Sequence, residues 1–426
     1  MKIRTVLIIL IFALSGSAVF IAKSNNVKDP AQCVFNTVFG VEEIDSSFFY
    51  NPPQKVLSSI DHGLDWLKKA QHPDGGWGAG FHHKQGIMDP HAVPADPATT
   101  SMVCMALLRT GSTLSDGPFR VELEKATDFL VNAVEITPPD GSNITKLTNT
   151  QIQRKLGNNI DLILTAQYFS NLLEVLDKGS DLYEKIFVWL NVCVDSIQLN
   201  QAQNGSFKGS GWAGVLQSAF ANNALESAQY RGAWVNDEIL DKSRDYQKGN
   251  YDLETNRVAT TDGAGVVLYS VSSSTRASAK EARKAEEAIS EAIEEGYLST
   301  GAEITIDNLV KAGYAEDQAL KFESSYNIYQ AAKRHSVDPN VTRGFGNNGG
   351  EEFISFLQTG ESMIINKDDA WKQWFDNVSG QLLTIQNADG SWNGHHCITS
   401  PVFCTATSVL ILSVNNDIDQ LVALGR

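Results

Sequence analysis

Two histidines and two cysteines near the C-terminus have side chains of the types that bind metals or act as nucleophiles. His395, His396 and Cys397 are consecutive, and Cys404 follows in the next apolar stretch. Zinc prefers imidazole nitrogens and thiolate sulfurs, so His396, Cys397 and Cys404 form a candidate zinc-binding set. In a second interpretation, an oxidising compartment favours a Cys397–Cys404 disulfide. In a third, both are free thiols, or one is a catalytic cysteine paired with a histidine.

Three carboxylates add candidates for acid–base chemistry. Glu351 and Glu352 begin an apolar stretch after the glycine-rich turn Gly344–Gly350, and Asp96 begins another apolar stretch. A carboxylate at a helix start caps free N–H groups and is favoured by the helix dipole. The alternative is that one of them works as a general acid or base, or as a metal ligand, beside the histidines. The candidate catalytic residues are His395, His396, Glu351, Glu352 and Asp96.

A repeated heptapeptide indicates which elements position these residues. Gln71–Trp77 reads QHPDGGW and Gln386–Trp392 reads QNADGSW. Each copy follows an amphipathic stretch, residues 56–70 or 370–385, and each precedes an apolar one. A helix–turn–helix unit that recurs along a chain is typical of stacked helical pairs.

Four weaker copies of this unit lie between the two strong ones. Their turns are Pro138–Gly141, Gln203–Phe207, Lys248–Tyr251 and Gly344–Gly350. The outer helices are charged on one face, whereas the inner helices are small and apolar and must be buried on all sides. We therefore predict an all-α fold, an (α/α)6 toroid in which six helical hairpins close into a ring around a central pit.

The charged stretch Arg276–Glu295 does not fit the period of the repeat. It has strong helix formers throughout, so we predict a solvated helix within an insertion at about residues 272–313. The toroid domain then spans residues 55–426, after an irregular arm at residues 23–54.

The N-terminus has the pattern of an export signal. Lys2 and Arg4 precede an uncharged run from Val6 to Ala22. We interpret residues 1–22 as a signal peptide or an N-terminal membrane anchor, which would contact the membrane if it is not cleaved. This places the mature domain outside the cytoplasm, as a periplasmic, extracellular or anchored protein.

The net charge of −16 excludes partners that need a basic surface. Nucleic acids and anionic membrane surfaces are bound through clustered lysine and arginine. No oligomeric state follows from the sequence.

The heptapeptide QxxDGxW resembles the repeat of the terpenoid cyclase and protein prenyltransferase superfamily, whose best-known repeat is that of squalene cyclase. The resemblance is specific at Gln71–Trp77 and Gln386–Trp392 and extends as periodicity over roughly residues 55–414. It implies an (α/α) ring whose pit is lined by the starts of the inner helices. The glutamine is expected to reach backbone groups of a neighbouring helix, and the tryptophan to stack there.

The catalytic motifs of these families match less well. The chain has no DxDD acid of the squalene and hopene cyclases, and the nearest sequence is Asp417–Gln420. The zinc-binding prenyltransferases tend to place a histidine where this chain has Cys404, and no Asp-x-Cys precedes it. The lanthipeptide cyclases bind zinc through two cysteines and a histidine, to which His396, Cys397 and Cys404 are similar.

The resemblance implies a protein that binds an apolar isoprenoid or lipid ligand in its pit, with catalysis left open. One alternative is a hydrolase or lyase that acts on an extracellular polymer through rim histidines and glutamates. Another is a non-catalytic binding module. An apolar pit favours the first, a polar groove with arginine and carboxylates favours the second, and a filled centre favours the third.

The ring also predicts a cluster. All outer-to-inner turns lie on one face, so the fifth and sixth turns are neighbours and the first turn closes beside the sixth. We therefore expect Glu351, Glu352, His395, His396 and Cys397 to meet at the mouth of the pit, where buried polar groups need partners.

Overall fold

The computed structural model describes residues 44–137, 143–207, 209–342 and 349–425. Ser47–Arg426 form one compact unit, which is described by itself. The predicted signal or anchor at residues 1–22 lies outside the described residues. So do most of the arm at 23–54, the whole turn Pro138–Gly141 and most of the turn Gly344–Gly350.

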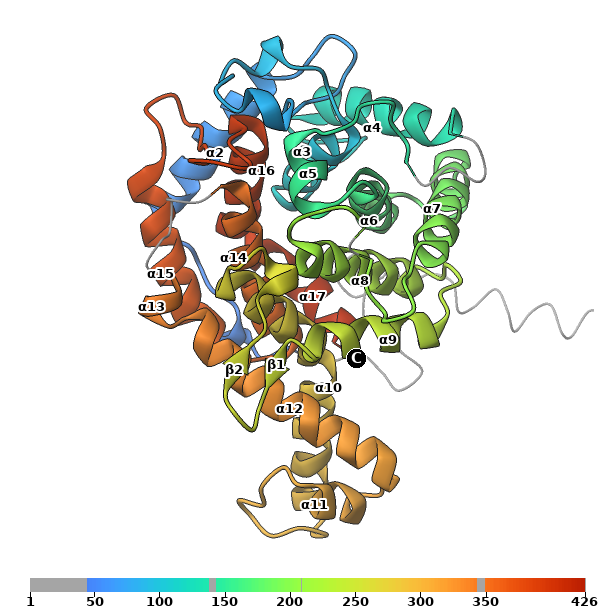
Figure 1. Ribbon diagram of the computed structural model, residues 1–426, viewed down its shortest axis with the longest axis vertical. Coiled ribbons are helices and arrows are strands. Elements are labelled where there is room, and N and C mark those ends of the chain that lie inside the picture. Colours follow the sequence, from blue (N-terminus) through green and yellow to red (C-terminus); the bar gives the residue numbers. More distant parts are fainter. Residues whose placement is uncertain (1–43, 138–142, 208, 343–348, 426) are drawn as a thin grey trace, which may run out of the picture. The chain divides into compact units, whose positions relative to one another are not determined.

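The described part of this unit is an all-α ring, as predicted (Figure 1). Its inner helices are α3 (Pro97–Arg109), α6 (Ile160–Val175), α8 (Gly214–Tyr230), α10 (Val267–Glu294), α14 (Gly350–Ile365) and α16 (Pro401–Leu412). Each inner helix packs against the next, and α16 packs against α3, so the inner circle is closed. The outer helices are α2 (Gln54–Lys69), α4 (Arg120–Glu135), α7 (Asp181–Leu199), α9 (Asp237–Lys248), α12 (Glu316–Ser336) and α15 (Ala370–Ile385).

Short elements connect and cover these helices. They are η3 (Ser46–Phe48), η4 (His82–Lys84), η5 (Pro90–Ala92), α5 (Gln151–Leu156), η6 (Thr261–Gly263), α11 (Ile306–Lys311), α13 (Pro339–Thr342), η7 (Val414–Asp417) and α17 (Ile418–Leu424). The strands β1 (Tyr251–Asp252) and β2 (Arg257–Val258) form a small antiparallel hairpin. None of the helices in the described ranges is long and apolar enough to cross a bilayer.

The tryptophans of the heptapeptide fix each turn to its own helical pair. Both are fully buried, and the indole N–H of Trp77 donates to the Leu67 carbonyl at 2.8 Å. Trp392 donates in the same way to the Leu382 carbonyl at 2.9 Å. Each indole therefore bonds a carbonyl in the last turn of the preceding outer helix.

The glutamines and glycines fix each turn to the next outer helix. The Gln71 side-chain amide donates to the carbonyls of Gly75 and Glu122, both at 2.8 Å, and Gln386 bridges Gly390 and Ser59 in the same way. Gln201, in a weaker copy, bridges its own turn and α9. Gly390 has a φ of +95°, and a Cβ there would lie 2.6 Å from the His62 carbonyl oxygen, so only glycine fits. The predicted role of the glutamine is confirmed.

The insertion differs from the prediction in one respect. Residues 276–294 are not a separate solvated helix, because they continue α10 out of the ring, and Arg276, Glu281 and Arg283 on this stretch are buried. These charged side chains are paired within the protein. A charge-rich stretch that was predicted to face solvent is therefore partly buried. Beyond the ring, Ala285, Ile289, Leu309 and Ala319 pack a small core of their own, and α11 lies at the far end of this lobe (Figure 1).

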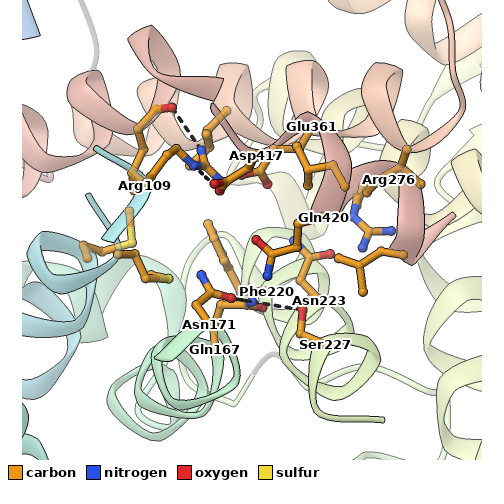
Figure 2. A pocket seen from close by; sticks show the side chains of 17 residues that line it. Arg109, Gln167, Asn171, Phe220, Asn223, Ser227, Arg276, Glu361, Asp417 and Gln420 are labelled. Atoms are coloured by element: carbon orange, nitrogen blue, oxygen red, sulfur yellow. Dashed lines mark hydrogen bonds and ion pairs between the residues drawn. The ribbon is translucent and has the colours of Figure 1, made fainter. Parts of the chain in front are cut away.

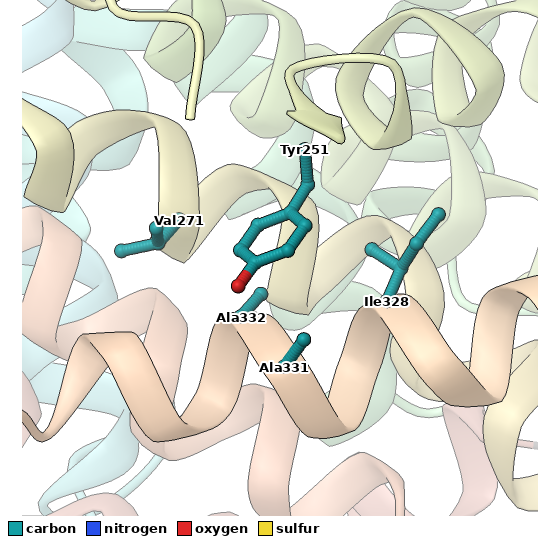
Figure 3. Packing of buried hydrophobic residues seen from close by; sticks show 5 residues of the cluster. All are labelled: Tyr251, Val271, Ile328, Ala331 and Ala332. Carbon is teal, nitrogen blue, oxygen red and sulfur yellow. The ribbon is translucent and has the colours of Figure 1, made fainter. Parts of the chain in front are cut away.

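Helices α10 and α12 are also joined nearer the ring. Tyr251 of the hairpin packs against Val271 of α10 and against Ile328, Ala331 and Ala332 of α12 (Figure 3). The alanines allow the two helices to approach closely, and the tyrosine ring fills the space between them. This contact anchors the lobe to the ring.

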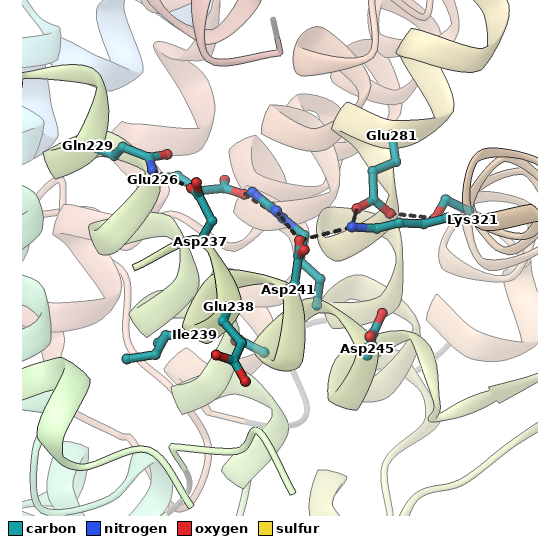
Figure 4. Close-up of polar contacts among 12 residues, drawn as sticks. Glu226, Gln229, Asp237, Glu238, Ile239, Asp241, Asp245, Glu281 and Lys321 are labelled. Carbon is teal, nitrogen blue, oxygen red and sulfur yellow. Dashed lines mark hydrogen bonds and ion pairs between the residues drawn. The ribbon is translucent and has the colours of Figure 1, made fainter. Parts of the chain in front are cut away.

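A buried set of ion pairs joins the helices on the same side. Glu226 of α8 accepts from Arg244 of α9 and from Arg276 of α10, each at 2.6 Å. The set continues to Glu281 of α10, which pairs with Lys321 of α12 at 3.1 Å (Figure 4). Buried charges of this kind are tolerated only when they are paired.

Helix α17 closes the ring at the C-terminal ends of the inner helices. Arg109 of α3 donates to Asp417, just before α17, at 2.5 Å and to Glu361 of α14 at 2.6 Å. The cavity beneath α17 measures about 60 Å³, and its lining includes Arg276, Asn223 and Gln420 (Figure 2). A space of this size holds a few water molecules and no larger ligand.

Candidate functional site

Helix α5 lies at the opposite mouth of the ring, where the inner helices begin. It is six residues long, and its residues contact all six repeats. In repeat order, the contacted residues are Gly80, Asp161, Ala213, Tyr269, Glu351 and Ser400. A short helix can reach six neighbouring helix starts only from the axis of the ring. Helix α5 therefore closes the mouth of the predicted pit.

Three side chains of α5 make its polar contacts. Gln151 accepts from the backbone N–H groups of Thr399, at 2.7 Å, and Ser400, at 3.1 Å. Gln153 donates to Asp161 at 2.8 Å. The Lys155 ammonium pairs with the Glu351 carboxylate at 3.0 Å. These contacts tie α5 to the starts of α16, α6 and α14.

An open pocket of about 480 Å³ lies beside α5. Its lining residues are Lys155, Trp212, Ala264, Val266, Tyr269, His396 and Cys397. They come from α5, from the loops that precede α8 and α10, from α10 itself and from the loop that precedes α16. This rim pocket has the size of a small-molecule site and combines apolar walls with a few convergent polar groups.

The polar groups of the rim pocket influence one another. Glu351, which is fully buried behind Lys155, also accepts from the Ile398 N–H at 3.3 Å. Burial and the Glu351 carboxylate raise the pKa of the Tyr269 hydroxyl, so this group stays protonated. Burial and Glu351 also raise the pKa of the Cys397 thiol, although Lys155 opposes that effect. Cys397 is therefore not an activated thiolate.

An aromatic and cationic group forms the outer edge of the rim pocket. Trp212 is 40% exposed, and the Arg154 guanidinium lies 4.8 Å from its ring centre. The His82 ring meets the same indole edge-on at 4.9 Å. Burial lowers the pKa of His82, and the charges of Arg154 and Lys155 lower it further. The exposed indole offers a flat surface on which a ligand can stack.

Backbone strain is also found at this pocket. Ala264 and Cys397 have φ angles of +53° and +61°, in the left-handed region that side chains other than glycine, asparagine and aspartate rarely adopt. Such residues cost roughly 1–3 kcal/mol each and are concentrated at ligand sites. Two strained residues in one pocket are independent support for a functional role.

The predicted meeting of the turns is confirmed in the described residues. The Gly350 N–H donates to the Ile398 carbonyl at 2.8 Å, which joins the fifth and sixth turns. Gln85 of the first turn accepts from the Cys397 N–H at 3.0 Å and from the Thr399 hydroxyl at 2.7 Å.

The candidate catalytic residues do not all reach the rim pocket. His396 and Cys397 line it, whereas His395 is exposed and stacks edge-on against His396. Glu351 and Glu352 are buried beneath the surface, and Glu351 acts on the pocket through Lys155. Glu351 is thus a positioning residue.

Among the described residues, the structure contains neither the predicted disulfide nor a zinc-binding arrangement of His396, Cys397 and Cys404. Cys397 and Cys404 are free thiols, and no group of three His, Cys, Asp or Glu side chains there is arranged to hold a metal. Cys404 is fully buried in α16 and donates to the Ile398 carbonyl at 3.7 Å, whereas Cys397 faces the rim pocket. His396, Cys397 and Cys404 therefore do not converge.

Asp96 is a helix cap that none of the described pockets reaches. It is fully buried and accepts from the Thr99 and Ala79 N–H groups, each at 2.8 Å. Burial raises its pKa. The neighbouring Asp161, at the start of α6, has its pKa raised to about 7 by burial and by Asp96. Both carboxylates accept N–H groups at the start of α3, Asp96 from Thr99 and Asp161 from Ala98 at 3.1 Å. The catalytic interpretation of Asp96 has no support in this geometry.

Helix α5 was not predicted from the sequence, and neither were Lys155 and Trp212 as pocket residues. A local signal for this helix exists, because Thr150 and Gln153 form a capping box in which each side chain bonds the backbone of the other residue. Helix α5 is too short to show hydrophobic periodicity. Nothing local indicates that it closes the mouth of the ring.

The fold and the site define a ring-shaped all-α protein with a polar, aromatic pocket at the mouth of the ring. No protein-family model matches the chain, and no curated protein matches it either. Among solved structures it is similar to variants of the type II terpene cyclase MstE from Scytonema. One variant, bound to geranylgeranyl dihydroxybenzoate, is 13% identical, with a TM-score of 0.42 over 85% of this chain and 98% of that chain. Another, bound to merosterolic acid A, is 11% identical, with a TM-score of 0.34 over the same shares.

Proposed function

We propose that the rim pocket binds an anionic ligand that carries a ring with an apolar face, such as an acidic sugar of an extracellular polymer, and that the protein is a hydrolase or lyase for it. The observation that carries this proposal is one pocket of about 480 Å³ lined by the Lys155 ammonium, the Trp212 indole and the His396 imidazole. A carbohydrate ring stacks on an exposed indole, while an ammonium binds a carboxylate or sulfate on that ring.

The charge around the pocket supports an anionic ligand. The whole chain has a net charge of −16, but Arg154 and Lys155 gather at this edge. A local cationic cluster on an acidic protein concentrates the field where it attracts an anion.

The pocket side chains fit acid–base cleavage. Lys155 would hold the acidic group of the sugar and so stabilise negative charge that develops beside it. His396 would take a proton from the substrate or from water, since imidazole exchanges protons near neutral pH. The Tyr269 hydroxyl, kept protonated by burial and Glu351, would donate a hydrogen bond to the leaving oxygen, and the protonated His396 would return its proton there.

An apolar isoprenoid or lipid in a central pit has less support. Helix α5 closes one mouth of the ring, α17 closes the other, and the cavity beneath α17 is only about 60 Å³. Ligand pockets commonly measure roughly 300–1,000 Å³. The third alternative, a protein that binds its ligand without cleaving it, is tested by measuring turnover in the wild-type protein.

Replacing Trp212 with alanine is expected to weaken binding of an oligogalacturonate about two- to tenfold, because a stacking contact contributes roughly 0.5–1.5 kcal/mol. Isothermal titration calorimetry measures the affinity. The matched control is Trp234→Ala, since Trp234 is 69% exposed and lines none of the described pockets. Wild-type protein that binds a neutral cello-oligosaccharide as tightly as the acidic one, or equal losses in both variants, would contradict the proposal.

Replacing His396 with alanine is expected to lower kcat/KM on the same substrate by about a hundredfold or more, since a general acid or base contributes that much. The melting temperature should barely change, because His396 is exposed. New reducing ends and the ultraviolet absorbance of an unsaturated product report hydrolysis and elimination, respectively. The control is His83→Ala, an exposed histidine in the first rim loop. If the wild-type protein binds the substrate but does not cleave it, the protein is a binding module and not an enzyme.

The proposal places the ring outside the cytoplasm, where acidic polymers are found. It is supported by the basic residues Lys2 and Arg4 ahead of the uncharged run Val6–Ala22. An anchored form would keep this segment in the membrane.

A further inference from the structure

The geometry points to α5 as a gate of the ring, held shut by the Lys155–Glu351 ion pair and released when an anionic ligand takes Lys155. The ligand-controlled part of this inference rests on the proposed function. Lys155 belongs both to α5 and to the lining of the rim pocket, so whatever binds in the pocket acts directly on the helix that closes the mouth.

Helix α5 is bounded by two residues suited to hinges. Asn149, just before it, has a φ of +59°, and Gly157, just after it, has a φ of +113°. Asparagine and glycine adopt positive φ angles more readily than other residues. A hinge consists of a few such residues whose φ and ψ angles change when a segment moves. The capping box of Thr150 and Gln153 closes the first turn of α5 within itself. The helix is therefore built to move as one unit.

Polar side chains and backbone hydrogen bonds join α5 to its neighbours, and buried apolar side chains fix it in the mouth of the ring. Gln151 and Gln153 contact α16 and α6 through neutral hydrogen bonds, and Lys155 supplies the ion pair to α14. Beneath them, Ile152 and Leu156 are fully buried in the mouth of the ring. Outward movement of α5 would withdraw these two side chains and leave an apolar opening toward the axis. In this inference, the structure with α5 in the mouth of the ring is the closed state of the gate.

Both partners of the ion pair are buried, but only Lys155, which is 5% exposed, lines the rim pocket. Glu351 is fully buried and is fixed by the Ile398 N–H, whereas Lys155 lines the open pocket. An anion in the pocket offers Lys155 a second carboxylate and competes with Glu351. Since a ligand shifts a two-state equilibrium by its differential affinity, a ligand that draws Lys155 outward favours the open state.

The first test measures hydrogen–deuterium exchange in the full chain without ligand. In Glu351→Gln, the amides of residues 151–157 should exchange at least tenfold faster than in the wild type, while the ring helices stay protected. The matched control is Glu361→Gln, which breaks another buried ion pair of the same helix at the opposite end of the ring. Unchanged exchange at 151–157, or acceleration of all the ring helices together, would overturn the gate.

The second test adds a saturating oligogalacturonate to the wild-type protein, with binding measured separately by calorimetry. Faster exchange at residues 151–157 supports release by the ligand. Binding with unchanged or slower exchange there overturns ligand control and leaves the proposed function standing. Absence of binding overturns the proposed function and ligand control together, and the ligand-free comparison of Glu351→Gln with Glu361→Gln then decides the gate.

Discussion

Replacing Trp392 with alanine is expected to lower the free energy of unfolding by about 3–5 kcal/mol, the range for a large aromatic side chain removed from a packed core. Trp392 is fully buried, and its N–H groups donate to the Leu382 carbonyl and the Thr405 hydroxyl, both at 2.9 Å. Its ring also packs against α2, where a Cβ at Gly63 would lie 3.0 Å from it. Trp392 therefore joins the last repeat to the first and closes the ring.

Urea-induced unfolding followed by far-ultraviolet circular dichroism measures this loss. Trp392→Phe separates its parts, because phenylalanine keeps most of the buried area and loses the indole hydrogen bond, worth about 1 kcal/mol. The surface control Trp234→Ala should leave the unfolding curve unchanged within about 0.5 kcal/mol. A Trp392→Ala protein as stable as Trp234→Ala would show that the turn does not hold the ring together.

Replacing Glu226 with glutamine is expected to cost about 3–5 kcal/mol, because two buried guanidinium groups would lose their shared carboxylate. Arg244 and Arg276 each bond Glu226 at 2.6 Å, and Arg276 is 3% exposed. The loss should again be measured by urea-induced unfolding near neutral pH. A result below about 1 kcal/mol would mean that the arginines find other partners or water.

The same ion pairs predict how stability depends on pH. Burial alone raises the pKa of Glu226, but Arg276 and Arg244 overcome this effect and lower the pKa to about 2. A lowered pKa in the folded state means that the contribution, about 3 kcal/mol, is fully present above the unfolded pKa of about 4.5. It is lost as the pH falls from about 4.5 through 2.

The variant and a surface control test this pH window. Glu226→Gln should show a weaker fall in stability across the acid range than the wild type does. Glu238→Gln on α9 removes an exposed ion pair with Lys242 and should keep the pH dependence of the wild type. If Glu226→Gln and the wild type unfold identically in acid, Glu226 does not cause the pH dependence of stability.

The sequence by itself determined the ring, because each helical pair carries its own local signals. Gln386, Gly390 and Trp392 act within one turn and on the two helices beside it, so their spacing is readable along the chain. The order of the turns around the ring follows from the repeat, and the contact of Cys397 with Gln85 bears it out.

Only the tertiary structure decided what occupies the centre of the ring and which side chains form the rim pocket. Whether a turn residue points to solvent, pocket or core depends on the neighbouring repeats. Cys397 faces the rim pocket and Cys404 the core, although both are close in sequence to His396. Lys155 gains its partner Glu351 only across the ring. Local patterns report the faces of single helices. The rim pocket instead combines side chains from α5, α10 and the loops before α8, α10 and α16, and no local pattern encodes that combination.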